Sequence, residues 1–114
     1  MCFTVNSLDL EGKEGVTRHF YFSQILQNHI FQLVTRFKNK VDMWDVVNEA
    51  LNDDGSLRET IFLKMIGENY IEKAFQYANE SDPNVALAYN DYNLYKPKKR
   101  AGAIRIINSL KEKV

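Results

Sequence analysis

Residues 41–50 have the sequence VDMWDVVNEA, and this short stretch decides the fold class of the chain. Up to Val47 the residues are mostly apolar and several are β-branched, which is typical of a strand buried on both faces. Strands of that kind belong to parallel sheets. We therefore expect residues 41–47 to form a strand of a parallel sheet, followed at its carboxyl end by the polar pair Asn48 and Glu49.

The segments on either side of this strand have helical periodicity. From Ser23 to Phe37 apolar residues recur at three- and four-residue steps, which predicts a helix with one buried face. After the strand, residues 52–55 are a turn, and Ser56 followed by Glu59 predicts a capping box at the start of the next helix. We expect that helix to be long and continuous until Pro83 prevents its extension.

A second strand is expected at residues 85–89, and a third helix from Pro97, whose fixed φ suits a first helical position. The order helix, strand, helix, strand, helix predicts parallel βα units and an α/β fold. A closed eight-stranded barrel takes about 250 residues. We therefore expect the 114 residues to be part of a larger structure, because the edges of the two strands need further strands to pair with.

Residues 1–22 have no clear pattern and are left unassigned as a segment of their own before residues 23–114. They fit either a native loop or the remnant of an insertion. The basic residues of the segment 96–100 are expected to form the solvated start of a helix. His19 and His29 have no partner at the spacing of a metal site or a catalytic triad, and we expect both to be structural or exposed.

Composition narrows the classes of function. The chain is 45% hydrophobic with a formal net charge of zero, so it has the composition of a globular protein and no electrostatic footprint for nucleic acid or an anionic membrane. It has no apolar stretch approaching the roughly 20 residues of a membrane span, and its start lacks the layout of a signal peptide. Its single cysteine, Cys2, excludes an internal disulfide.

Polar side chains follow both expected strands. Asn48 and Glu49 end the first strand, and the segment 90–93, Asn-Asp-Tyr-Asn, follows the second. In parallel α/β structures the catalytic and binding groups gather at the carboxyl ends of strands. Carboxylates, amides and an aromatic ring are suited to binding sugar hydroxyls and covering a ring face, although polar loop residues without a special role fit the pattern equally well.

The segment 44–50, WDVVNEA, resembles very closely the fourth-strand signature of glycoside hydrolase family 10, the endo-β-1,4-xylanases. The segment 90–93 falls where that family has its fifth-strand motif, and the segments 66–71, 74–75 and 82–84 follow the family pattern too. The resemblance covers roughly residues 23–113 without a gap. It implies a partial (β/α)8 TIM barrel that contains about two βα units, from the third helix through the fifth.

The resemblance implies a role for four residues. Glu49 would be the general acid/base of a retaining endo-1,4-β-xylanase, and Asn48 would bind the 2-hydroxyl of the reacting sugar. Tyr92 and Asn93 would line the aglycone side of the cleft. Trp44 and Asp45 match the motif as well, but we expect barrel packing and a structural hydrogen bond from them. Met43 and Met65 are expected in the core.

The family's second carboxylate, the nucleophile, lies on a later strand that these residues do not include. Asp91 is a poor substitute, since two strands alone would not exclude water or hold the geometry. We expect xylan or xylo-oligosaccharide as the ligand, no cofactor or metal, an extracellular or periplasmic location, and no activity from the isolated chain. The alternative is a non-catalytic carbohydrate-binding or assembly fragment, which recruits missing barrel segments or a second copy through its strand edges.

Overall fold

The computed structural model describes residues 15–114, with side chains from Arg18 onward. Six elements follow one another: α1 (Gly15–Arg36), β1 (Met43–Asn48), α2 (Ile61–Ile66), α3 (Tyr70–Ser81), β2 (Ala86–Asn90) and α4 (Pro97–Lys113). Cys2 and the rest of residues 1–14 lie outside the described residues. Helix α1 begins well before Ser23, within the segment that the sequence pattern leaves unassigned.

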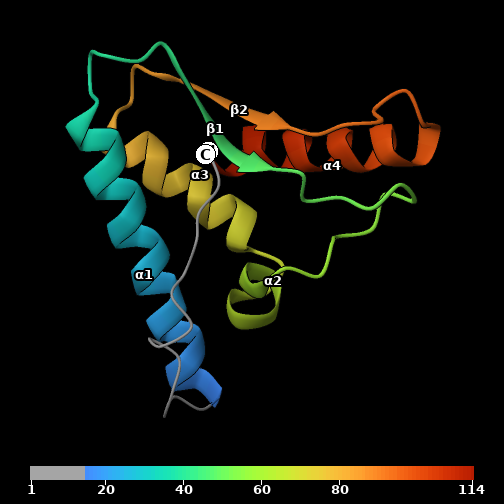
Figure 1. Cartoon of the computed structure of the whole chain (residues 1–114), viewed down its shortest axis with the longest axis horizontal. Helices are drawn as coiled ribbons and strands as arrows, with labels where there is room; N and C mark the ends of the chain where they lie inside the picture. The colour runs from blue at the N-terminus through green and yellow to red at the C-terminus, as the bar shows by residue number, and fades with distance from the viewer. Residues whose placement is uncertain (1–14) are drawn as a thin grey trace.

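The two strands are parallel neighbours, as the sequence predicts (Figure 1). Met43 pairs with Ala86 at one end and Asn48 pairs with Asn90 at the other, with one irregularity between Asp45 and Val47. Helix α3 connects the strands and packs against both of them. The chain is thus an α/β structure of two strands alternating with helices.

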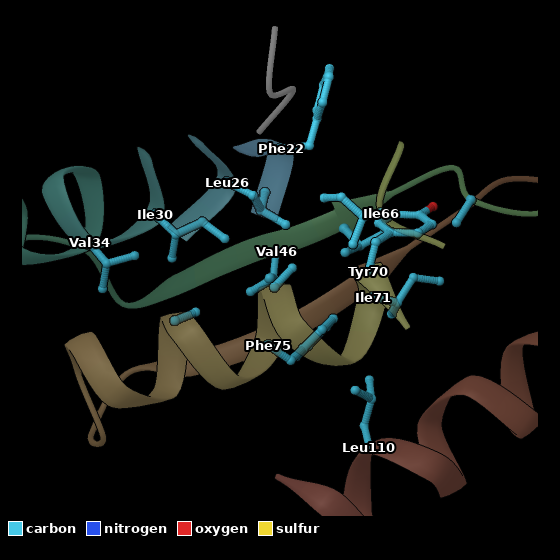
Figure 2. Close-up of a cluster of buried hydrophobic side chains, with 14 residues drawn as sticks. Phe22, Leu26, Ile30, Val34, Val46, Ile66, Tyr70, Ile71, Phe75 and Leu110 are labelled. Carbon is cyan, nitrogen blue, oxygen red and sulfur yellow. The ribbon is translucent and has the colours of Figure 1, made fainter. Parts of the chain in front are cut away.

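The core lies between α1, β1 and α3, and α4 extends it at one side (Figure 2). Helix α3 lies between α1 and α4 and contacts both. The buried apolar residues are Phe22, Leu26, Ile30 and Val34 of α1, Val46 and Val47 of β1, Ile66 of α2, Tyr70, Ile71, Ala74, Phe75 and Ala78 of α3, Ala50 and Leu51 after β1, and Leu110 of α4. This agrees with the helical periodicity of the sequence.

Two expectations about the middle of the chain are wrong. The long helix is interrupted at Gly67, which has a φ of +102° and ends α2. The capping box does not form, because Thr60 caps α2 by accepting a hydrogen bond from the Leu63 amide at 3.2 Å. Ser56 instead belongs to the preceding turn, where its hydroxyl donates to Asp54 Oδ1 at 2.5 Å.

Helix ends are otherwise as expected. Pro97 is the first residue of α4, and α3 ends just before Asp82 and Pro83.

Met65 packs on the core, but Met43 is 56% exposed, so the expectation of a buried Met43 is wrong. Trp44 is partly buried, with its ring edge-on to Phe37 at 6.2 Å between centroids. Both histidines are exposed.

Candidate active site at the carboxyl ends of the strands

The carboxyl ends of β1 and β2 meet at one rim, which brings together the two polar segments that the sequence singles out. The Asn90 amide donates from Nδ2 to Asn48 Oδ1 at 2.7 Å, and the backbone N–H of Glu49 donates to the Asn90 carbonyl at 2.8 Å. The placement of Asn48, Glu49 and residues 90–93 at a common rim is therefore confirmed. Parallel pairing in this register requires it, because Asn48 is directly opposite Asn90.

Glu49 has an unusual backbone. Its φ is +54°, in the left-handed region that a glutamate seldom adopts. Strain of this kind costs about 1 kcal/mol or more, persists only where neighbouring interactions enforce it, and is often found at functional sites. Here the hydrogen bond from the Glu49 amide to Asn90 holds the residue at the rim.

Arg58 links the two segments of the rim through its guanidinium. Its Nη1 lies 3.7 Å from Glu49 Oε2, and its Nη2 donates to the Tyr92 hydroxyl at 2.9 Å. Glu49 and Tyr92 both remain accessible. The Glu49 side chain is 44% exposed, and the whole Tyr92 residue is 48% exposed. An acid and an aromatic ring are thus presented side by side to solvent.

Asn93 takes a different position from Tyr92. Its φ is +57°, and its side-chain amide donates to Asp53 Oδ1 at 3.5 Å. Asp53 also forms an ion pair with Lys96 at 2.6 Å. The contacts of Asn93 therefore tie the loop after β2 to the loop after β1.

A buried ion pair lies beneath the rim. Lys99 Nζ is 3.0 Å from Asp91 Oδ1, and both side chains are completely buried. Burial alone would raise the pKa of Asp91, but the hydrogen bond from the Tyr89 hydroxyl, the contact with the Lys99 ammonium and hydrogen bonds from the backbone outweigh it and leave the pKa below its usual value. Burial, together with the hydrogen bond to Asp91, raises the pKa of the Tyr89 hydroxyl.

This ion pair corrects one sequence expectation and supports another. The segment 96–100 is not a uniformly solvated basic run, since Lys99 is buried. The sequence gives little warning of this, because the burial of Lys99 depends on the fold bringing Asp91, Tyr92 and Asp53 around its ammonium group. Asp91 is unsuited to nucleophilic attack because its carboxylate is engaged by Tyr89 and Lys99.

A cavity of about 240 Å³ adjoins Glu49. Asn48, Glu49, Arg58 and Thr60 supply its polar wall, and apolar side chains of α1, β1, α2 and α3 supply the rest. Ligand pockets usually have volumes of about 300–1,000 Å³. The cavity beside Glu49 is smaller than that range.

Within residues 15–114 no three His, Cys, Asp or Glu side chains are grouped in a way that could hold a metal ion. None of the helices in that range has the length and apolar character needed to span a bilayer.

Comparison with known proteins identifies the class. The sequence profile of Glycosyl hydrolase family 10 matches residues 5–114, and the chain belongs to that family. It is 42% identical to endo-1,4-beta-xylanase A of Xylanibacter ruminicola over 103 residues, which are 90% of this chain and 27% of that protein. It is 48% identical to endo-1,4-beta-xylanase A of Thermotoga neapolitana over 92% of this chain and 10% of the relative.

A solved relative shows the same arrangement. The structure of xylanase 10B from Thermotoga petrophila RKU-1 in complex with xylobiose superposes with a TM-score of 0.81 at 42% identity. The match covers 90% of this chain and 31% of that one. The chain thus corresponds to a part of the family's barrel, and it spans about a tenth to a third of the length of these relatives.

Proposed function

We propose that the chain is the segment of a retaining endo-1,4-β-xylanase that supplies the general acid/base, Glu49. The observation that carries the proposal is that the ends of β1 and β2 lie side by side, with Glu49 and Asn48 each hydrogen-bonded to Asn90. This places a carboxylic acid beside amide and aromatic groups at the edge where parallel α/β enzymes perform their chemistry. Similarity to named xylanases supplies the reaction and the polymer.

In this proposal each side chain has a separate task. Glu49 protonates the departing glycosidic oxygen and later removes a proton from the water that releases the covalent sugar. The hydrogen bond with Asn90 uses the amide oxygen of Asn48, so the amide nitrogen is the group that would donate to the sugar's 2-hydroxyl. Tyr92 and Asn93 line the side of the leaving sugar.

Retention needs a second carboxylate about 5–5.5 Å from the first. Asp91 does not meet that need, because Lys99 and Tyr89 hold it beneath the rim. The nucleophile would come from a strand outside the described residues. We therefore expect no turnover from the chain by itself.

Complementation tests the proposal. The chain is mixed with the remaining strands and helices of a related xylanase barrel from which the matching segment has been deleted, and reducing sugar released from soluble xylan is measured. We expect activity only from the mixture, loss of that activity with Glu49→Gln, and full activity with Glu112→Gln, an exposed carboxylate on α4. Equal activity of the parent and Glu49→Gln mixtures would refute the role of Glu49 as general acid/base. Turnover by the chain alone would contradict the expectation that it is inactive by itself.

A second candidate is an assembly fragment without catalysis. The observation in its favour is that, in the described part of the chain, β1 and β2 pair only with each other, which leaves the outer edge of each strand without a ladder partner there. Open edges recruit further strands. Size-exclusion chromatography of the purified chain separates the cases: oligomers support recruitment through these edges, and a monomer at micromolar concentration argues against it.

A further inference from the structure

The Asp91 carboxylate joins three parts of the molecule. Besides Lys99 of α4, it accepts hydrogen bonds from the Tyr89 hydroxyl, from the Leu51 amide at 3.3 Å and from the Tyr92 amide at 2.8 Å. Removing two charges from water is costly and is compensated only when geometry and additional hydrogen bonds are good. An ion pair with this many partners fixes where the loop after β2 leaves the sheet.

The same lysine also contacts the aromatic ring at the rim. Lys99 Nζ lies 3.6 Å from the centroid of the Tyr92 ring, well within the roughly 6 Å range of cation–π attraction. The hydroxyl of that ring accepts the hydrogen bond from Arg58 at 2.9 Å. The ring is therefore held by two cations, with Lys99 at 3.6 Å and the Arg58 guanidinium carbon at 5.7 Å from its centroid, and 48% of the residue is still exposed.

We propose that Lys99 is a positioning residue for sugar binding, which holds one face of Tyr92 from below so that its exposed side is presented to a xylosyl unit of the chain's substrate. The proposal rests on the function proposed above for Tyr92. Lys99 itself does not touch the sugar, since its side chain is completely buried. Its ammonium group neutralises Asp91, lies 3.6 Å from Asp53, which Lys96 also neutralises, and orients Tyr92. The pairing with Asp91 and the orientation of Tyr92 can be separated by mutation.

Comparison of a variant that lacks only the Lys99 charge with one that lacks the charges of both Lys99 and Asp91 separates the two tasks. Lys99→Met alone leaves Asp91 buried without its counter-ion, and we expect the ratio of folded to unfolded chain to fall on the order of 100-fold or more. The double variant Lys99→Met with Asp91→Asn has no buried charge at this position, so most of that loss is expected to return. It still lacks the cation beneath Tyr92. Lys99→Arg keeps a cation, and Lys98→Met removes an exposed lysine from the same turn as a matched control.

The experiment uses the full 114-residue chain with ¹³C-labelled tyrosine, observed by NMR, and xylotriose as the probe. We expect the Tyr92 ring signals to change in the double variant and to stay at the parent positions in Lys98→Met. The affinity for xylotriose is expected to fall about fivefold in the double variant, the loss of one cation–π contact that orders the ring. Lys99→Arg is expected to restore most of that affinity.

Several results would overturn the inference. One is a folded double variant with unchanged Tyr92 signals and unchanged affinity. Another is a double variant that fails to fold, since Lys99 would then act on the fold and not on the ring. A third is a parent spectrum without dispersed Tyr92 signals. If the parent instead shows the ring contact but binds no xylotriose, the function proposed for Tyr92 fails while the contact with Lys99 stands, so the two failures are distinguishable.

Discussion

Replacement of Gly55 by alanine tests how the loop that carries Arg58 is held in place. Gly55 has a φ of +86°, and a Cβ added there would lie 2.4 Å from the Lys98 carbonyl oxygen and 3.2 Å from its carbonyl carbon. Because both atoms belong to the backbone of α4, no side-chain rotation relieves the clash. Gly102 of α4 faces the same loop closely, since its own added Cβ would lie 2.9 Å from the Gly55 oxygen.

Two costs contribute to the expected destabilisation. An alanine in the left-handed region costs about 1–2 kcal/mol, and forcing extra volume into a closely packed contact costs about 1–3 kcal/mol more. We therefore expect Gly55→Ala to lower the free energy of unfolding by about 2–5 kcal/mol. Moving the loop would also weaken the hydrogen bond from Arg105 to the Gly55 carbonyl, now 3.0 Å long.

Urea unfolding followed by circular dichroism measures the effect, with Gly67→Ala as the control. Gly67 also has a positive φ, of +102°, but the nearest atom to an added Cβ is 3.8 Å away. The control reports the cost of a side chain at φ +102° and ψ −179°, a region open almost only to glycine, without a clash. A loss of stability of about 1 kcal/mol or less in Gly55→Ala would refute the close approach of the loop to α4.

Three further changes probe the rim and its supports. Glu49→Asn is expected to stabilise the chain by about 0.5–1 kcal/mol, because asparagine tolerates the positive φ better than glutamate does; a lower urea midpoint would contradict the strain inferred from φ. Asp91→Asn is expected to flatten the acid dependence of stability. The pKa of Asp91 is lowered on folding, so its contribution is present above its ordinary pKa of 3.8 and is lost as the pH falls through the folded value. Equal slopes of parent and variant below pH 4 would disprove this. Thr60→Ala should cost about 1 kcal/mol by removing the cap on the Leu63 amide, and Thr60→Ser should cost little; calorimetry compares them, and equal losses would exclude a capping role.

The middle of the chain shows why a local pattern can mislead. Apolar periodicity from Ile61 to Ala78 is continuous and predicts one helix, but Gly67 adopts a conformation that ends α2 and redirects the chain into α3. A glycine within a helical pattern is a known signal of a break. Whether such a glycine breaks the helix depends on whether packing on either side favours two short helices over one long one.

The capping box fails for a related reason. Ser56 and Glu59 have the right spacing, but the serine is already engaged with Asp54 in the tight turn at 52–56. Thr60, four residues later, takes the capping role. Local hydrogen bonds of serine with a turn compete directly with helix capping, and the turn prevails here.

The amino-acid sequence alone determined the α/β class, the alternation of strands and helices apart from the break at Gly67, and the position of Asn48, Glu49 and residues 90–93 at strand ends. These features depend on local periodicity and on turn chemistry, which arise from residues close together in the sequence. Only the tertiary structure decided the burial of Lys99, its contact with Tyr92 and the bridge that Arg58 makes from Glu49 to Tyr92. Those contacts depend on how the loops after β1 and β2 and the start of α4 come together, and whether a charged side chain is solvated or buried depends on which partners the fold brings to it.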